Sequence, residues 1–279
     1  MNYREIYEAG KTILAPLTDA DLDARLLLEA ACGTDLQTLL AHPEREVSGE
    51  EEARYRALLG RRAEREPVAY ILGQQEFMGL PFYVTDDVLI PNQDTEFVTE
   101  EAMRHLHDGM HILDLCTGSG CILLSLLHYT NGCTGVGTDL SEAALGVARR
   151  NAEQLGIRGA SFSQGDLYGA VDPGERFDLI ISNPPYIPSE VIGTLEPEVR
   201  CREPRMALDG GQDGLLFYRR ILAGAKDHLK PGGQLFFEIG YDEAQAVCAL
   251  MREAGLADVT WEKDFGGQDR VVCGTLPLL

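Results

Sequence analysis

Two glycines and an aspartate in the middle of the chain have the spacing of a nucleoside-binding site. Gly118 and Gly120 lie in the run Asp-Leu-Cys-Thr-Gly-Ser-Gly at 114–120, where they allow a tight turn and close approach of the backbone to a ligand. Asp139 follows about 20 residues later, a distance at which an acidic residue suits the hydroxyls of a ribose. Leu123 stands where a dinucleotide fingerprint has its third glycine. The pattern favours an adenosine-containing ligand and leaves its kind open.

The run Asn183-Pro184-Pro185-Tyr186 directly follows an apolar stretch at 177–182. A residue before proline is kept out of the helical region, so Asn183 and Pro184 are both expected to be extended. Proline has no N–H, which leaves the Asn183 side-chain oxygen and the Pro184 carbonyl as acceptors, with the Tyr186 ring beside them. Two acceptors suit a planar NH₂ group, such as an amide or an aromatic amine. An Asn-Pro pair alone would predict only a turn.

Together, the run at 114–120, Asp139 and the 183–186 motif resemble the S-adenosylmethionine-dependent N-methyltransferases. Longer stretches resemble the PrmC/HemK family, the protein-(glutamine-N5) methyltransferases of peptide-chain release factors. These stretches are 67–73, 88–91, 183–188, Glu203-Pro204 with Ala207-Leu208 and Gly211, and 269–271. Because the resemblance covers nearly the whole chain, it implies a family as well as a type of chemistry.

The resemblance implies a role for each position. The cofactor S-adenosyl-L-methionine would be held at its methionine end, its ribose and its adenine, and the substrate would be the glutamine of the Gly-Gly-Gln loop in class I release factors. The residues implied for the cofactor are Cys116, Thr117, Gly118, Ser119 and Gly120 (methionine end), Asp139 (ribose), Asp166 and Leu167 (adenine), and Asn183. Asp114 would add negative charge near the sulfonium. Asn183, Pro184, Pro185 and Tyr186 would bind the glutamine, and Asn183, Pro184 and Tyr186 would act in catalysis.

Three positions depart from the usual pattern of these proteins. Asn92-Gln93-Asp94 stands where similar proteins usually show Arg-Pro-Glu, which affects contacts near the methionine end. Cys116 stands where glycine is frequent, which we interpret as a small change. Gln268 replaces a residue that is usually basic, which alters how the protein substrate docks.

The elements that must position these residues alternate between strands and helices. We expect strands at 111–115, 134–139, 160–164, 177–182 and 234–238, helices at 120–129, 141–155, 214–229 and 242–254, and two closing strands at 259–263 and 270–274. This order predicts an α/β fold, with a doubly wound, mostly parallel seven-stranded sheet of the Rossmann-like class I methyltransferase type. The closing pair has no helix between its strands, which predicts an antiparallel hairpin at one edge. Ligands of such sheets bind beyond the carboxyl ends of the strands, where both motifs stand.

The first quarter of the chain has a different pattern. Residues 2–72 are helical in character, with one helix that follows Asp19 and closes at Gly33, and another that begins at a Ser48/Glu51 capping box and runs to Glu66. Short apolar runs broken by Gly-x-Pro then predict a hairpin. We therefore expect an N-terminal helical substrate-docking domain at 1–73, a hairpin linker at 74–90 and a methyltransferase domain at 91–279.

The composition limits the partners. The 279 residues include 45 acidic and 24 basic side chains, a net charge of −21, and such a surface argues against DNA or RNA, whose phosphates attract basic grooves. Apolar runs of about 18 residues and a signal-peptide pattern are missing, so we expect a cytoplasmic protein without a membrane partner. The seven cysteines contain no C-x-x-C, and His105, His107 and His111 have no partner at metal-ligand spacing, so we expect no disulfide or metal. We also expect a monomer.

Two other functions stay open. One is an N-methyltransferase that acts on the exocyclic amine of a base in DNA or RNA, and the acidic charge argues against it. The other is a non-catalytic, cofactor-binding adaptor, and the complete 183–186 motif argues against that.

Overall fold

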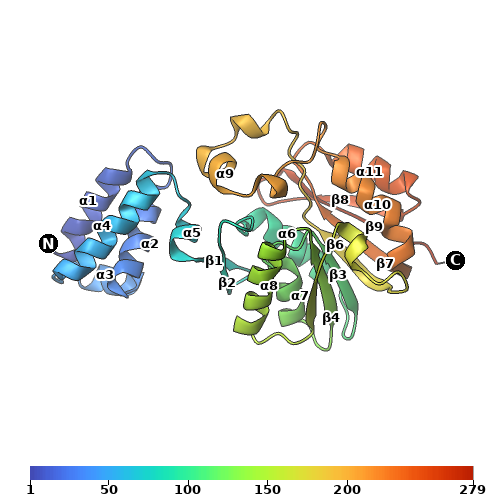
Figure 1. Ribbon diagram of the computed structural model, residues 1–279, viewed down its shortest axis with the longest axis horizontal. Coiled ribbons are helices and arrows are strands. Elements are labelled where there is room, and N and C mark those ends of the chain that lie inside the picture. The colour runs from blue at the N-terminus through green and yellow to red at the C-terminus, as the bar shows by residue number, and fades with distance from the viewer. Residues whose placement is uncertain (279) are drawn as a thin grey trace. The chain divides into compact units, whose positions relative to one another are not determined.

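The computed structural model describes residues 1–278, which fall into two compact units (Figure 1). The helical unit consists of Met1–Gln74 together with Glu196–Arg202. The sheet unit consists of Gln75–Leu195 and the described residues from Glu203 onward. No sequence pattern had assigned Glu196–Arg202 to the helical unit, because its neighbours on both sides belong to the other one.

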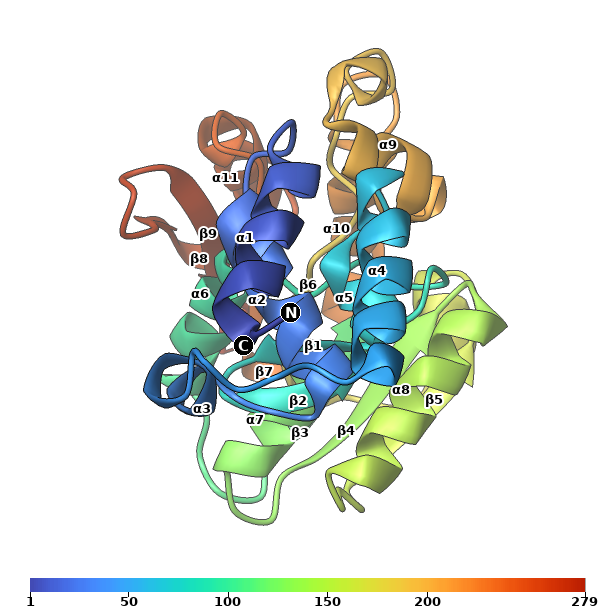
Figure 2. The same cartoon turned by 90° about the vertical axis from the view of Figure 1, so that its left-hand side faces the viewer.

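The helical unit is built from α1 (Tyr3–Leu14), α2 (Ala20–Cys32), α3 (Leu36–Ala41), α4 (Gly49–Ala63), α5 (Val68–Leu72) and α9 (Pro197–Arg202). Helices α1, α2 and α4 lie side by side around a core that includes Tyr3, Leu27 and Tyr55 (Figure 2). The predicted capping box is confirmed, since Ser48 and Glu51 exchange hydrogen bonds at the start of α4. The helix ends at Ala63, three residues before the predicted end.

An ion-pair cluster attaches α9 to this unit. Arg62 is buried and contacts Asp23 at 2.6 Å and Glu198 at 3.1 Å, and Arg65 contacts the same Glu198. Burial raises the pKa of Asp23 and the guanidinium of Arg62 opposes that rise. Since Arg62 and Asp23 are both buried, each depends on the other, and loss of one would leave the other without its closest counter-charge.

The sheet unit contains a small hairpin and a seven-stranded sheet. The hairpin pairs β1 (Gln74–Phe77) with β2 (Leu80–Tyr83). The large sheet has the order β5-β4-β3-β6-β7-β9-β8, in which all pairs are parallel except those of β9 with β7 and β8. Its strands are β3 (His111–Leu115), β4 (Thr134–Asp139), β5 (Ala160–Gln164), β6 (Phe177–Ser182), β7 (Leu229–Glu238), β8 (Ala257–Lys263) and β9 (Asp269–Thr275). The predicted fold class is confirmed.

Helices cover both faces of this sheet, and the strands show why. Side chains alternate between the faces, so Leu179 and Ile181 of β6 enter one core while Ile180, between them, enters the other. The first core is shared with α6 (Gln93–Met103) and α7 (Cys121–Tyr129), with α8 (Glu142–Gln154) beside them. The second is shared with α10 (Leu216–His228) and α11 (Ala244–Glu253). Three short helices, η1 (Leu167–Ala170), η2 (Ile192–Thr194) and η3 (Arg205–Ala207), lie in loops.

The direction of winding reverses between β3 and β6. From β3 the chain adds β4 and β5 on one side, then returns to place β6 on the other side. Loops that leave the carboxyl ends of these two strands diverge, and a ligand-binding crevice forms between them. Among the described residues, no helix is long and apolar enough to cross a membrane.

We expect Gly10→Ala to destabilise the helical unit by about 1–3 kcal/mol, the usual cost of overpacking. A Cβ at this position in α1 would lie 1.9 Å from the hydroxyl oxygen of Tyr55, which is itself buried and donates to the Ala24 carbonyl. The matched control is Gly60→Ala in α4, where a Cβ meets no atom within 4 Å and alanine should stabilise the helix by about 0.5–1 kcal/mol. Urea denaturation followed by circular dichroism measures both. A Gly10→Ala protein as stable as Gly60→Ala would contradict this packing.

Candidate active site

A cavity of about 280 Å³ lies in the sheet unit, at the loops that follow β3, β4, β5 and β6. It brings together most of the predicted site residues, although they come from four separate loops. The predicted residues in its lining are Cys116, Thr117, Gly118, Ser119, Asp139, Asp166, Leu167, Asn183 and Pro185. Asp114, Gly120, Pro184 and Tyr186 are not among the lining residues.

The loop after β3 is held in a strained, compact turn. Gly118 and Gly120 have φ angles of 54° and 78°, in the left-handed region that glycine enters without steric cost. Cys116 also lies there, with φ at 62°. A side chain makes this backbone conformation costly, so cysteine in place of glycine is not the small change that we inferred. Beneath the turn, the fully buried Asp114 accepts a 2.6 Å hydrogen bond from the Thr117 hydroxyl. Asp114 therefore supports the loop.

Asp139 joins two loops through its carboxylate. One oxygen accepts from the backbone N–H of Gly118 and the other from that of Ser141, both at 2.9 Å. Burial raises the pKa of Asp139, and these backbone hydrogen bonds oppose the rise. The same residue that was predicted to hold a ribose thus also fixes the glycine loop to the end of β4.

The cavity suits S-adenosyl-L-methionine in its charge and in its free polar groups. The hydroxyls of Ser119 and Thr138 are buried and have no hydrogen-bond partner among the described residues, and both residues are in the lining. Such groups are normally satisfied by a ligand or water. Acidic side chains outnumber basic ones in the lining, which suits a sulfonium cation. They are Asp87, Asp139, Asp166 and Asp209, against Arg220, which pairs with Asp166 at 2.7 Å.

The 183–186 motif presents acceptors, as the sequence predicts. The Asn183 side-chain nitrogen donates to the Thr95 hydroxyl at 3.0 Å. Neither the Asn183 side-chain oxygen nor the Pro184 carbonyl accepts a hydrogen bond from any described residue. Pro184 and Pro185 are buried, while Asn183 and Tyr186 are half-buried. The motif therefore offers two free acceptors on a rigid support.

A second segment, 203–211, completes the walls and was not assigned a structural role from the sequence. Backbone hydrogen bonds pair Ile187 with Leu208 and Gly210, and a Cβ on Gly210 would lie 2.7 Å from the backbone of Tyr186. The half-buried Glu203 accepts with its carboxyl from the backbone N–H of Ile90 at 3.2 Å, and desolvation raises its pKa to about 7. Glu203 thus ties this segment to 87–91, which lines the same cavity.

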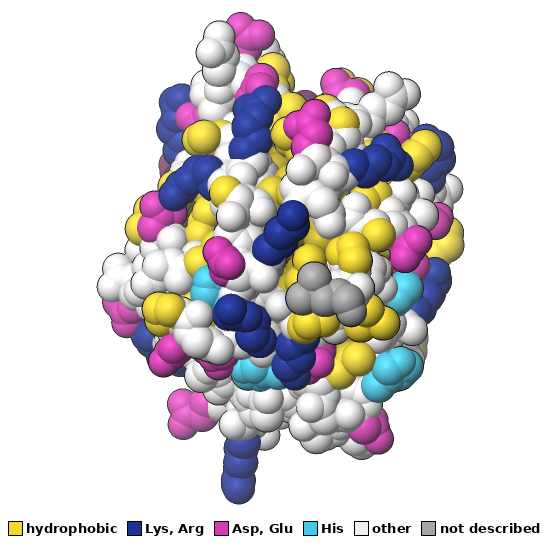
Figure 3. Space-filling view, turned by 90° about the vertical axis from the view of Figure 1, so that its right-hand side faces the viewer, with side chains coloured by type: hydrophobic (Ala, Val, Ile, Leu, Met, Phe, Trp, Pro, Cys, Tyr) yellow, Lys and Arg dark blue, Asp and Glu magenta, His cyan; other side chains and the backbone are white. Residues whose placement is uncertain are grey.

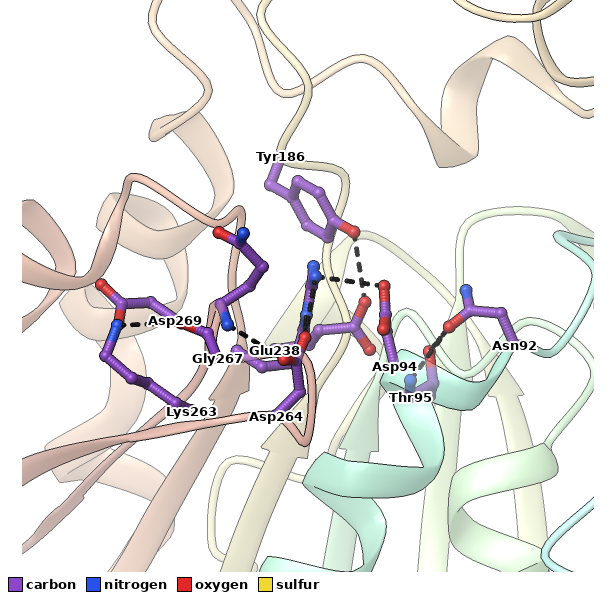
Figure 4. A network of polar contacts seen from close by, with 11 residues as sticks. Asn92, Asp94, Thr95, Tyr186, Glu238, Lys263, Asp264, Gly267 and Asp269 are labelled. Carbon is purple, nitrogen blue, oxygen red and sulfur yellow. Dashed lines mark hydrogen bonds and ion pairs between the residues drawn. The ribbon is translucent and has the colours of Figure 1, made fainter.

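Behind Tyr186 lies a buried carboxyl at the end of β7. The Tyr186 hydroxyl donates to Glu238 at 3.2 Å, and Glu238 is fully buried (Figure 4). Its second oxygen has no hydrogen-bond partner in the described part of the chain. Burial raises the pKa of Glu238 to about 7, against the charge of Arg270 and the hydrogen bond from Tyr186.

Arg270 connects the β8–β9 hairpin to the start of α6. Its guanidinium contacts Asp94 at 3.2 Å and Asp264 at 3.3 Å, and Asp264 accepts from the backbone N–H of Gln268 (Figure 4). Gln268, the position predicted to affect docking, thus lies in a hairpin tip that is fixed to the site by an ion pair. The stretch 269–271, one of those that carry the family resemblance, contains this arginine.

Sequence reasoning missed Thr95, Glu203 and Glu238 as site residues. Glu203 and Arg270 lie inside stretches that carry the family resemblance, and this could have identified them. The sequence gives no such signal for Thr95 and Glu238, because a threonine in a helix and a glutamate after an apolar strand occur in most proteins. His105 and His111 contact Gln234 and Thr134, and the described residues contain no cluster with metal-ligand geometry.

Comparison with known proteins shows which protein families and structures this chain is similar to. Residues 5–73 match the family model described as PrmC N-terminal domain, and residues 106–264 match a methyltransferase domain. The chain is 45% identical over 258 residues to the release factor glutamine methyltransferase of Geobacter sulfurreducens, covering 92% of this chain and 90% of that protein. It is 45% identical over 263 residues to the enzyme of the same name from Caulobacter vibrioides, covering 93% and 91%. A methyltransferase structure from Pyrococcus furiosus superposes with a TM-score of 0.56 at 20% identity, over 78% of this chain and 98% of that one, which shows the fold.

We expect Glu238→Gln to raise the free energy of unfolding by up to about 3 kcal/mol above pH 7, with a gain that shrinks as the pH falls. Burial raises the pKa of Glu238 from 4.5 to about 7. The carboxyl therefore contributes stability that is full below pH 4.5 and lost as the pH rises through about 7, whereas glutamine stays neutral and can still accept from Tyr186. Urea denaturation across this pH range measures the difference, with the exposed Glu253→Gln as control. A gain independent of pH would contradict the assignment.

Proposed function

The chain belongs to the family of release factor glutamine methyltransferases, and on that premise we propose that it methylates the side-chain amide of the glutamine in the Gly-Gly-Gln loop of class I release factors. The observation that carries the proposal is the pair of free acceptors at Asn183 and Pro184 beside a cavity suited to S-adenosyl-L-methionine. The partners named by the relatives supply the substrate class, and the site supplies the group that reacts.

The reacting group follows from the number of acceptors. A glutamine amide is planar and has two N–H hydrogens, one for each free oxygen at Asn183 and Pro184. Its nitrogen is a poor nucleophile because the lone pair is delocalised into the carbonyl. Hydrogen bonds to both N–H groups favour a more pyramidal nitrogen and direct its lone pair away from the two acceptors. The Tyr186 ring, held by its hydrogen bond to Glu238, offers a flat surface for the amide.

S-adenosyl-L-methionine supplies a methyl group on a positively charged sulfur. The protein's contribution is position, since holding two reactants in line accounts for as much as about 7–11 kcal/mol of barrier reduction in well-oriented systems. The amide nitrogen gives its lone pair to the methyl carbon to form the new N–CH₃ bond, while the bond from that carbon to sulfur breaks and leaves its electron pair on the sulfur. The methylated nitrogen is acidic enough to release its proton to water, so this scheme needs no strong general base.

The charge distribution favours a protein substrate over a nucleic acid. Residues 76–279 contain 31 acidic and 15 basic side chains. On the face shown in Figure 3, Lys and Arg side chains are spread among acidic and hydrophobic ones. Nucleic-acid grooves require gathered positive charge. We infer a cytoplasmic enzyme, because release factors act in the cytoplasm, and we also propose that it acts as a monomer.

A methyl-transfer assay with radiolabelled S-adenosyl-L-methionine tests the proposal. We expect label on unmethylated release factor and none on its Gln→Ala variant in the Gly-Gly-Gln loop. Bulk tRNA, rRNA and DNA serve as competing acceptors in parallel reactions. Label on a nucleic acid instead would assign the acceptor pair to a base amine, and cofactor binding without any label would favour an adaptor.

We expect Asn183→Ala to reduce the single-turnover rate of methyl transfer by on the order of 100-fold, as when one positioned polar group is removed from other active sites. Binding of S-adenosyl-L-methionine should fall much less, because the remaining loops still line the cavity. Rapid-quench measurements give the rate and calorimetry gives the affinity. Asn131→Ala, at an exposed asparagine, is the matched control and should behave as wild type. An unchanged rate in Asn183→Ala would remove this residue from the mechanism.

A further inference from the structure

The orientation of the Asn183 side-chain amide decides whether the site works. An amide can rotate by half a turn with almost no change in shape, which exchanges its oxygen and its NH₂ group. With the oxygen toward the substrate, Asn183 accepts a hydrogen from the glutamine amide. With the NH₂ group there instead, two donors would face each other. The two orientations differ in the hydrogen bond that the other end of the amide makes.

That other end contacts Thr95, the third residue of α6. Thr95 is only 3% exposed, lies in the cavity lining, and receives the Asn183 nitrogen on its hydroxyl at 3.0 Å. The same hydroxyl lies 3.2 Å from the side-chain oxygen of Asn92, to which it donates. A threonine hydroxyl has one hydrogen. Because that hydrogen is given to Asn92, the hydroxyl can only accept from Asn183.

The start of α6 keeps Thr95 in place. Asn92 is the N-cap of the helix, and its side-chain oxygen also accepts the backbone N–H of Thr95 at 3.0 Å (Figure 4). Asp94 is held by Arg270, and the Thr99 hydroxyl donates to the Thr95 carbonyl at 2.8 Å.

We propose that Thr95 is a positioning residue for methyl transfer: its hydroxyl, oriented by the N-cap Asn92, fixes the Asn183 amide with its oxygen toward the substrate. The inference rests on the proposed function and assigns a task to a helix start outside the 183–186 motif. The hydrogen bonds run in one direction, from Asn183 to Thr95 to Asn92, and so determine which end of the amide stays free.

The test compares Thr95→Val, which keeps the branched shape and removes the hydroxyl, with Thr95→Ser, which keeps the hydroxyl. We expect Thr95→Val to slow single-turnover transfer to unmethylated release factor by about 10- to 100-fold, the range for loss of one buried positioning hydrogen bond. Thr95→Ser should remain within about threefold of wild type, and the affinity for S-adenosyl-L-methionine of both should stay within about threefold. Equal rates in Thr95→Val and wild type, or a Thr95→Ser protein as slow as Thr95→Val, would overturn the inference.

A double-mutant cycle separates positioning from a general structural effect. In the Asn183→Ala background there is no amide left to orient, so Thr95→Val should cost nothing further. The same loss in both backgrounds would mean that Thr95 acts independently of Asn183, and would overturn the inference. Failure of the proposed function looks different, because wild type itself would then place no label on the release factor.

Discussion

Parallel pairing places Leu115, the last residue of β3, beside Ser182, the last residue of β6. The buried Ser182 hydroxyl donates a 2.6 Å hydrogen bond to the Leu115 carbonyl, which fixes this register at the end of the two strands. The residues that follow are Cys116 and Asn183. A slip of one residue in either strand would turn its buried side chains to the opposite face of the sheet, so the two cores on either side enforce the register. The meeting of the glycine loop with the 183–186 motif is therefore a consequence of packing throughout the sheet.

Buried polar groups then set the directions of the side chains at this meeting point. Glu238 is removed from water, and its ionised form is disfavoured, as its raised pKa shows. The positive charge that opposes this effect is that of Arg270, which also forms ion pairs with Asp94 and Asp264. Tyr186 uses the carboxyl as its acceptor, and the arginine connects the β8–β9 hairpin to the start of α6. The Tyr186 ring beside the acceptors is therefore held by its hydrogen bond to a buried carboxyl.

Much of this was predictable from local pattern. The apolar run at 177–182 and the helix caps at Ser48 and Ser141 act over a few residues, so the sequence specifies them directly. The loops after parallel strands must meet at one edge of the sheet, which is why a ligand site could be predicted there from two motifs far apart in the sequence. Thr95 could not be found in this way, because its contact with Asn183 spans 88 residues. The contact of Arg62 with Glu198 spans 136 residues and likewise depends on the folded chain.

The sequence pattern led to a wrong interpretation at Cys116, where the backbone conformation determines the cost of the side chain. By side-chain size, cysteine in place of glycine at position 116 is a small change, but φ at 62° makes it a conformational one. Sparsely populated backbone conformations of this kind persist only where the surrounding structure imposes them. Here the Thr117 hydroxyl bond to Asp114 and the Gly118 N–H bond to Asp139 hold the turn from both sides. The strain in Cys116 is thus offset by the same hydrogen bonds that shape the cofactor loop.

The unusual Asn92-Gln93-Asp94 run is consistent with this arrangement of donors and acceptors. Arginine at position 92 would bring only N–H donors, whereas asparagine brings an oxygen that caps α6 and takes the Thr95 hydrogen. With arginine there, the Thr95 hydroxyl would lose the acceptor to which it donates its hydrogen. Asparagine at the N-cap supplies that acceptor at every pH, because an amide oxygen does not titrate. The asparagine at position 92 is therefore the residue on which the proposed orientation of Asn183 depends.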